Sequence, residues 1–452
     1  MAGTYLLRTF GTPDGPGGGT FIWTMSAWVK KTGTGADVGI MTRYVNSGKF
    51  VKIFFNSDDQ LEYAVYNSSY QARYQTSARY RDINSWYHIV IAQDSTLATA
   101  ADRVKIYVNG ELITSFAVNT QIGQNIGGDF NTASAPHQIG AYNATQFFDG
   151  LMSAFNFIDN TQYAASDFGS TDATTGQWKI NTNPSVTYGA TGFSILNNGN
   201  TITDQSTNSN NWSEEGSPGI VSNTKDCPSN VFATGNPLIG RSSSGTNLVP
   251  ALSNGNLTAL ADGSTWQIFK STLGASSGKY YAEFKWISDS NTRYAYVGIY
   301  DEDNYAEKAT GYPYMGDMAN GYGYYSESGD YWNNSSSTSF GSSFNSSGDG
   351  IQGVAMDLDN SKLYFSKNGV WQGSGDPSNG TGGISITANR TYTFGLQLYA
   401  VGSIVFSANF GNGFFGTSAV ADNSTATAST PGVFNYDVPT GYQPLSTKGL
   451  NA

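Results

Sequence analysis

The stretch Val104-Lys-Ile-Tyr-Val-Asn-Gly-Glu-Leu112 decides the fold class of this chain. Its valines and isoleucine alternate with lysine and tyrosine, and a period of two is typical of a strand with one buried face. The Asn-Gly pair that follows tolerates positive φ at both central positions of a type I′ turn, which makes it a strong hairpin signal. We therefore expect a hairpin whose return strand covers Leu112–Phe116.

The same alternation recurs along the rest of the chain. Further strands are expected over residues 21–31, 51–55, 61–65, 86–91, 151–158, 280–286, 295–300, 351–358, 363–365, 392–399 and 404–410. A second Asn-Gly pair, Asn368-Gly369, predicts a second hairpin. A helical period of 3.6 residues never persists for three turns. Short strands separated by turn signals favour an all-β chain of two β-sandwich, jelly-roll-type domains.

The length and the local composition predict how these domains are arranged along the chain. A chain of 452 residues is long enough for two or three domains. Strand patterning fills residues 1–168 and 247–452, which we expect to be the two β-sandwiches. Between them, residues 169–246 are rich in Ser, Thr, Asn, Gly and Pro but keep isolated aromatic anchors. We expect an irregular connector there that lies on one or both domains.

Charge and hydropathy argue against several classes of partner. The chain has 23 Lys plus Arg against 34 Asp plus Glu and no basic block, so nucleic acid is a poor partner. No run of about 18 apolar residues occurs, which argues against a membrane span. The first residues lack the apolar core of a signal peptide, so we expect synthesis in a cytosol without Sec export.

The inventory of reactive side chains argues against an enzyme. His88 and His137 are the two histidines; the first lies inside an alternating strand and the second in a loop, and we expect both to be structural. The Glu-x-Asp-x-x-Glu pattern that would place a glycosidase's carboxylates on one strand face does not occur. We expect no catalytic residues and no cofactor.

A Ca²⁺ site is left open by the sequence. Oxygen ligands could come from two loops, with Asp129, Asn131 and Asp149 as one set and Asn56, Asp58 and Asp59 as the other. Asp-rich turns also arise because Asp and Asn side chains bond their own backbone. We therefore assign no metal ligands.

One segment stands out as a candidate binding surface for a ligand or a partner. Its aromatic residues, spaced by Gly, Ser, Asp and Asn, are Tyr312, Tyr314, Tyr322, Tyr324, Tyr325, Tyr331 and Trp332. Tyrosine and tryptophan supply rigid, amphipathic contact area at low entropic cost, as in antibody paratopes. The alternative is a strand pair whose aromatics cover the domain core.

The first third of the chain resembles the concanavalin A-like modules of the laminin G and pentraxin type. The resemblance rests on Phe21-Ile-Trp-Thr-Met-Ser-Ala-Trp-Val-Lys30, Trp86-Tyr-His-Ile-Val-Ile91, the hairpin around Asn109-Gly110, Ile139-Gly-Ala-Tyr142 and Phe148-Asp-Gly-Leu-Met-Ser-Ala-Phe155, which occur in the order typical of those modules. It implies a β-sandwich over residues 1–168.

The last 200 or so residues resemble a SPRY domain. The matching pieces are Gly278-Lys-Tyr-Tyr-Ala-Glu-Phe284, Gly353-Val-Ala-Met-Asp-Leu-Asp359, Lys362-Leu-Tyr-Phe-Ser-Lys-Asn-Gly369 and Pro439-Thr-Gly-Tyr442. The resemblance implies a second β-sandwich whose ligand loops fall near the aromatic segment.

The connector resembles segments that join such modules in tailed-phage virion proteins. The similar stretches are Asp204-Gln-Ser-Thr-Asn-Ser-Asn-Asn-Trp212 and Asp226-Cys-Pro-Ser-Asn-Val-Phe-Ala-Thr-Gly-Asn-Pro-Leu238. The resemblance implies a non-enzymatic virion appendage, such as a fibre, decoration or adhesin-like subunit. Other virion proteins, a host-surface glycan or receptor, and copies of the same chain in a homo-oligomer would then be its partners. A polysaccharide-degrading tail enzyme and a SPRY-type protein-binding adaptor are the alternatives.

Overall fold

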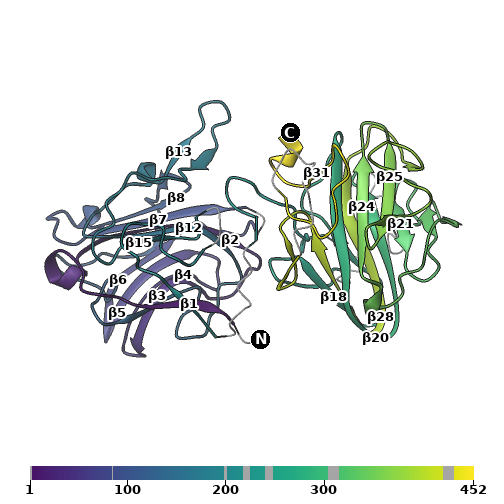
Figure 1. Cartoon of the computed structure of the whole chain (residues 1–452). Helices are drawn as coiled ribbons and strands as arrows, with labels where there is room; N and C mark the ends of the chain where they lie inside the picture. Colours follow the sequence, from purple (N-terminus) through teal and green to yellow (C-terminus); the bar gives the residue numbers. More distant parts are fainter. Residues whose placement is uncertain are drawn as a thin grey trace. The chain divides into compact units, whose positions relative to one another are not determined.

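The chain divides into two compact units in a computed structural model. Unit 1 comprises Met1–Asn223 with Cys227–Ser229, and unit 2 comprises Thr224–Asp226 with Asn230–Ala452. The structure describes residues 3–83, 85–197, 201–216, 224–239, 248–303, 315–420 and 432–451. Both units are built from antiparallel sheets, which confirms the expected all-β class (Figure 1).

Two sheets form the body of unit 1. The larger sheet runs in the order β10 (Phe116–Thr120), β6 (Ser69–Thr76), β5 (Leu61–Asn67), β4 (Lys49–Phe55), β3 (Val38–Asn46), β11 (Pro136–Ile139), β1 (Tyr5–Thr9) and β16 (Ser213–Glu215). The smaller sheet runs in the order β15 (Phe193–Ile195), β12 (Gly150–Asp159), β2 (Ile22–Lys31), β7 (Tyr87–Asp94), β8 (Val104–Val108) and β9 (Glu111–Leu112). A separate hairpin of β13 (Gly169–Thr171) and β14 (Trp178–Ile180), and the 3₁₀ turns η1 (Pro16–Gly19), η2 (Ala100–Asp102) and η3 (Ala165–Asp167), complete the unit.

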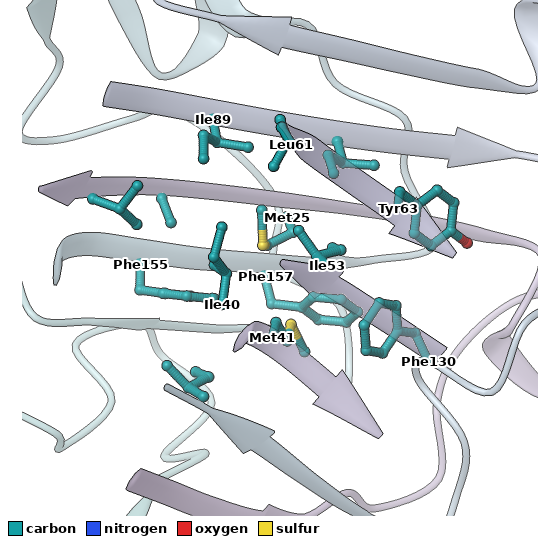
Figure 2. Packing of buried hydrophobic residues seen from close by; sticks show 14 of the residues in the cluster. Met25, Ile40, Met41, Ile53, Leu61, Tyr63, Ile89, Phe130, Phe155 and Phe157 are labelled. Carbon is teal, nitrogen blue, oxygen red and sulfur yellow. The ribbon is translucent and has the colours of Figure 1, made fainter. Parts of the chain in front are cut away.

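The core of unit 1 lies between these two sheets. Met25 on β2, Ile53 on β4 and Phe157 on β12 are fully buried and project into the same apolar cluster (Figure 2). Each comes from an alternating strand, so every second side chain enters the core while its neighbours face outward. The period of two in the sequence therefore translates directly into a sheet-on-sheet core.

The hairpin around Asn109-Gly110 forms with one difference from expectation. Asn109 and Gly110 have φ values of 50° and 83°, which are the positive values that a type I′ turn requires. The return strand expected over Leu112–Phe116 is wrong in extent, because β9 ends at Leu112. The chain then crosses to the larger sheet, where β10 begins at Phe116 and pairs with β6.

The expected connector over residues 169–246 is shared between the units. Its first part packs on unit 1, where β15 extends the smaller sheet beside β12 and β16 extends the larger sheet beside β1. Within unit 2, the backbone N–H of Ala233 donates to the Leu445 carbonyl at 2.9 Å, and the Phe232 side chain is buried. Buried aromatic residues in this polar stretch thus lie in or next to segments that pair with a neighbouring strand.

Unit 2 is a sandwich whose two layers share a pair of long strands. The strands are β17 (Ala251–Ser253), β18 (Thr258–Asp262), β19 (Gln267–Lys270), β20 (Lys279–Asp301), β21 (Tyr322–Tyr325), β22 (Tyr331–Asn333), β23 (Ser336–Thr338), β24 (Ile351–Asp357), β25 (Lys362–Lys367), β26 (Val370–Trp371), β27 (Ile384–Ser385), β28 (Tyr392–Asn409), β29 (Phe414–Phe415), β30 (Ser418–Ala419) and β31 (Gln443–Pro444). Two 3₁₀ turns, η4 (Ser347–Asp349) and η5 (Gly449–Asn451), accompany them.

The strands β20 and β28 are each longer than the strands that the sequence predicted. The sequence predicted separate strands over 280–286 and 295–300, and over 392–399 and 404–410. In the structure, β20 and β28 pair continuously, from Glu283 opposite Asn409 to Asp301 opposite Tyr392. The polar stretch of β20 that suggested a turn, Ser288–Arg293, pairs with Ala400–Val405 of β28, so the ladder continues through it with a single register shift between Trp286 and Ser288.

The two layers of unit 2 face each other across a common core. The first half of β20 pairs with β24 and its second half with β21 (Figure 1). Tyr324 on β21 stacks on Phe365 on β25, with ring centroids 5.4 Å apart, although these strands share no hydrogen bonds. β20 therefore carries the chain from one layer to the other. Within the described residues, no helix is long and apolar enough to cross a membrane.

Candidate functional site

The aromatic segment singled out in the sequence divides between the two faces of its sheet. Tyr322 and Tyr324 lie on the inner face and are buried in the core of unit 2. Tyr331 packs against the same core from β22. These residues are structural, because their rings fill the space between the layers. Two further members of the predicted set, Tyr312 and Tyr314, lie outside the described residues.

Tyr325 and Trp332 lie on the opposite face of the sheet. Successive residues of a strand point to opposite sides, so Tyr325 is separated from Tyr324, and Trp332 from Tyr331. Both outward rings are partly exposed and pack at a centroid distance of 6.3 Å. These two residues are the part of the predicted set that the structure places on an accessible surface.

Four aromatic residues from distant parts of the sequence join them. We define the outer aromatic face as Trp266, Tyr294, Tyr296, Tyr325, Trp332 and Tyr399, all in unit 2. Tyr294 lies directly opposite Tyr399, and Tyr296 lies directly opposite Tyr325. Strand register therefore brings together residues that are more than 100 positions apart.

Part of this face is hollowed into an open depression. Its volume is about 560 Å³, and its lining residues are Trp266, Thr292, Tyr294, Tyr325, Glu327 and Tyr399. The Trp266 ring lies 5.4 Å from that of Tyr399 and 6.4 Å from that of Tyr294. The Trp266 and Tyr399 ring planes are tilted by 46°, and all three side chains are partly exposed. Such a surface can stack against a flat apolar ligand face.

A carboxylate provides the charge at this depression. The Tyr325 hydroxyl donates to Glu327 Oε2 at 3.1 Å. Burial, together with the hydrogen bond and the negative charge of Glu327, raises the pKa of Tyr325. Tyr325 thus stays a neutral donor at physiological pH, and exposed Glu327 offers its acceptor oxygens to hydroxyl or amide groups.

The layer beneath the outer aromatic face is closely packed. Met315 is fully buried against it, and the Met315 N–H donates to Gln397 Oε1 at 2.7 Å. A Cβ at Gly323 would lie 2.9 Å from a ring carbon of Tyr296 and 3.1 Å from the Met315 sulfur. Only glycine therefore leaves Tyr296 in its place. The tight underside holds the exposed rings in a fixed arrangement.

Sequence reasoning missed Trp266, Tyr294, Tyr296 and Tyr399 because it sought a contiguous aromatic run. One signal was present, because Tyr294 and Tyr296 flank Ala295 at the start of the strand predicted over 295–300 and thus share a face. The partner across the ladder, Tyr399, could be found only from the register of β20 and β28.

His88 is sealed within unit 1. Its Nδ1 accepts the indole N–H of Trp178 at 2.9 Å, and its Nε2 lies 2.9 Å from Ser26 Oγ. The imidazole stacks on Trp28 as well as Trp178, and burial lowers its pKa to about 3. The ring is neutral and out of reach of a substrate.

His137 is enclosed in the same way. Its ring stacks on Phe10 at 3.9 Å, and its Nδ1 lies 3.0 Å from the Ala135 carbonyl oxygen. Burial lowers its pKa to about 3. Both histidines therefore occupy structural positions, although His137 lies on β11 and not in the expected loop.

The carboxyl group of Glu283 is also inaccessible. Burial raises its pKa to about 7, although the N–H groups of Asn435 and Tyr436 both donate to it at 2.8 Å. A raised carboxyl pKa in an open cleft would suggest a general acid. Glu283 is fully buried and instead ties the segment around Asn435 to β20.

The oxygens considered for Ca²⁺ are mostly committed to protein groups. Asp129 pairs with Arg43 at 2.9 Å and with Lys49 at 3.2 Å. Asp59 pairs with Lys31 at 2.7 Å and with Arg81 at 3.3 Å. The others are Asp58, which pairs with Arg79; Asn56, whose Oδ1 accepts two turn N–H groups; Asn131, whose Oδ1 accepts from the Thr191 hydroxyl; and Asp149, which is exposed. Across the described ranges, no three His, Cys, Asp or Glu side chains gather as a metal site would require.

A family comparison bears on unit 1. Residues 12–166 match the family model described as the concanavalin A-like lectin/glucanases superfamily. Unit 1 has a concanavalin A-like fold. The match covers about a third of the chain, and its two-sheet core agrees with the resemblance seen in the sequence. No curated protein matches the chain.

Solved structures with partial likeness to the concanavalin A-like unit or to unit 2 include a pentraxin and a SPRY domain. The heptameric SAP-like pentraxin from Limulus polyphemus is 13% identical, with a TM-score of 0.26, over 36% of this chain and 72% of its own. The SPRY domain of human HERC1 is 15% identical, with a TM-score of 0.26, over 34% of this chain and 87% of its own. Domain 4 of AbnA, a GH43 extracellular arabinanase from Geobacillus stearothermophilus, is 17% identical, with a TM-score of 0.24, over 32% of this chain and 64% of its own.

Proposed function

We propose that this chain is a non-enzymatic recognition protein and that the outer aromatic face of unit 2 binds a surface glycan. The observation that carries the proposal is the open depression in which Trp266, Tyr294 and Tyr399 present tilted, partly exposed rings. Aromatic rings can stack on the apolar faces of sugars. Glu327 and Thr292, at the same depression, supply polar groups for sugar hydroxyls.

Among the described residues, the ionisable groups lack the arrangement of a catalytic centre, which favours a binding protein over an enzyme. The pKa values of the two histidines and of Glu283 are shifted, as those of catalytic groups often are. All three side chains are nevertheless buried and held by structural hydrogen bonds. Among the described residues, Glu327 is the carboxylate that lines the depression. Hydrolysis of a glycosidic bond generally requires a pair of carboxyl groups.

A glycan array with the full chain tests the binding site. We expect binding to at least one class of bacterial surface polysaccharide, and a loss of about tenfold or more in affinity for Trp266→Ala and for Tyr325→Ala. Val370→Ala is the matched control, because Val370 is a 66% exposed apolar residue of unit 2 outside the depression. Equal binding by all four proteins would refute the site, and capture of a host protein through the same residues would favour a SPRY-type adaptor.

We further propose that the protein is a phage virion appendage, a fibre, decoration or adhesin-like subunit that attaches to other virion proteins. The support is the order of modules in the sequence and the Asp204–Trp212 and Asp226–Leu238 stretches of the connector. Imaging of purified particles with and without this gene product tests the role. We expect an external density that disappears with the gene, and unchanged particles that lack the subunit throughout would contradict the proposal.

A further inference from the structure

A second aromatic surface lies on unit 1, on the outward face of its larger sheet. Val51 and Ile53 of β4 enter the core, so Phe50, Lys52 and Phe54 point to the other side. The register places Tyr44 opposite Phe50, and Phe50 opposite Tyr66. We define the unit 1 aromatic row as Tyr44, Phe50, Tyr66 and Tyr70, which lie on the four adjacent strands β3 to β6.

The rings of this row contact one another and remain partly exposed. Phe50 stacks on Tyr66 with centroids 5.0 Å apart, and Tyr66 meets the edge of Tyr70 at 5.1 Å. The Tyr70 side chain is 40% exposed. Neighbouring strands are about 4.8 Å apart, so the row extends for about 14 Å across the sheet. Among the described residues, the hydroxyls of Tyr66 and Tyr70 have no hydrogen-bond partner.

A lysine without an anionic partner lies beside the row. Lys52 Nζ is 3.6 Å from the Phe54 ring centroid and 5.1 Å from that of Tyr142. No carboxylate or other acceptor within the described ranges comes within bonding distance of this ammonium group. Burial among the rings lowers the pKa of Lys52, whereas the more distant charges of Asp37 and Glu62 raise it.

The other cations of strands β3 to β6 are already paired. Arg73 lies 4.9 Å over the Tyr70 ring, and its Nε donates to Glu62 Oε1 at 2.9 Å. On the same strand as Lys52, Lys49 shares Asp129 with Arg43. The face therefore offers one unmatched positive charge next to a band of aromatic rings.

We propose that the unit 1 aromatic row and Lys52 form a binding site for an acidic oligosaccharide, with a uronate carboxylate on Lys52 Nζ. The sugar rings stack on Phe50, Tyr66 and Tyr70, and the free tyrosine hydroxyls bond to sugar hydroxyls. The carboxylate provides the charge-assisted acceptor that the Lys52 ammonium lacks in the free protein. The site lies on a different unit from the outer aromatic face and is independent of it.

Single-stranded nucleic acid is the competing ligand, because it also combines flat rings with negative charge. Its backbone carries one phosphate per nucleotide and needs a groove with several cations. Here Lys52 is the unmatched cation, and Arg73 and Lys49 are neutralised by Glu62 and Asp129. A ligand with few charges and many hydroxyls fits this face better.

Titration calorimetry with polygalacturonate, alginate and hyaluronan tests the proposal. We expect the full chain to bind at least one of them, less tightly as salt is added, and to bind its methyl-esterified form about tenfold more weakly. Lys52→Met keeps the alkyl stem over Phe54 and should weaken binding of the acidic polymer about tenfold while leaving binding of the ester unchanged. Tyr70→Ser should weaken binding of both forms.

Two matched controls show whether binding depends on Lys52 and the unit 1 aromatic row in particular. Lys49→Met removes a lysine of the same strand whose charge is already paired, and Val370→Ala alters an exposed apolar residue of unit 2; neither should change the affinity. Thermal unfolding of each variant shows whether it is folded. Absence of binding to all three acidic polymers, wild-type affinity of Lys52→Met, or preferential binding of oligo(dT) would overturn the proposal.

Discussion

Tyr294 on β20 lies directly opposite Tyr399 on β28, with ring centroids 5.8 Å apart and ring planes at 29°. The pair joins residues 105 positions apart through the register of the two longest strands in the described part of unit 2. The two rings pack against each other at the depression, so each ring helps to hold the other in place there. A cross-strand aromatic pair of this kind stabilises both the sheet and the proposed site.

We predict a measurable coupling between these two rings. In a double-mutant cycle with Tyr294→Ala and Tyr399→Ala, the coupling free energy of unfolding should be about 1 kcal/mol. Urea denaturation followed by tryptophan fluorescence gives the four stabilities. Tyr399→Phe keeps the ring and is the control, which should retain the coupling. Strict additivity of the two alanine variants would show that the rings act independently.

Gly323→Ala should displace Tyr296 from the outer aromatic face. The added methyl group would lie 2.9 Å from the Tyr296 ring and 3.1 Å from the Met315 sulfur. Overpacking of this kind costs about 1–3 kcal/mol of stability. Glycan affinity at unit 2 should also fall. Gly348→Ala is the matched control, because its nearest neighbour would be Ser346 Oγ at 3.7 Å. Wild-type stability and glycan binding in Gly323→Ala would contradict this packing.

Unit 1 should lose stability as the pH falls below about 6.5. Burial lowers the pKa of His88 and of His137 to about 3 in the folded state, so the unfolded chain takes up protons first. At pH 5 each histidine should reduce the free energy of unfolding by about 2 kcal/mol relative to neutral pH. Calorimetric unfolding between pH 7 and pH 4 measures this loss. His88→Gln should show a smaller loss, and an identical acid profile would exclude His88 as a cause.

Glu283 should give unit 2 the opposite dependence on pH. Burial raises its folded-state pKa from 4.5 to about 7, so the folded chain holds this proton more tightly than the unfolded chain. Its contribution to stability is complete below pH 4.5 and is lost as the pH rises through 7, by about 3 kcal/mol. Glu283→Gln should flatten the profile of the unit 2 transition between pH 5 and pH 8. A wild-type unit 2 that grows more stable over that interval would contradict the assignment.

Several elements could be predicted from sequence patterns because the determining interactions are local. Alternation over Val104–Val108 and the Asn109-Gly110 turn specify a hairpin through φ, ψ and one buried face. The structural position of His88 follows from the alternating strand in which it lies, whereas His137, expected in a loop, lies on β11. The concanavalin A-like character of unit 1 was likewise visible in the order of its strands.

Other features depend on which strand lies beside which. The polar stretch Ser288–Arg293 suggested a turn, yet it continues β20 because β28 supplies a paired residue opposite each position, from Val405 to Ala400. Tyr324 and Tyr325 are identical and adjacent, but one fills the core and the other lies on the outer aromatic face. A one-residue shift of register would exchange them.

Local patterning and turn chemistry were enough to predict the all-β class, which the sheets of both units confirm. The assembly of both aromatic surfaces required the folded chain, since Trp266, Tyr294 and Tyr399 come together through long-range strand pairing. Only the folded structure shows that the Lys52 ammonium group lies against aromatic rings and has no anionic partner among the described residues. Side-chain alternation is encoded within a strand, whereas register between distant strands is set by the total burial and hydrogen bonding of the sheet.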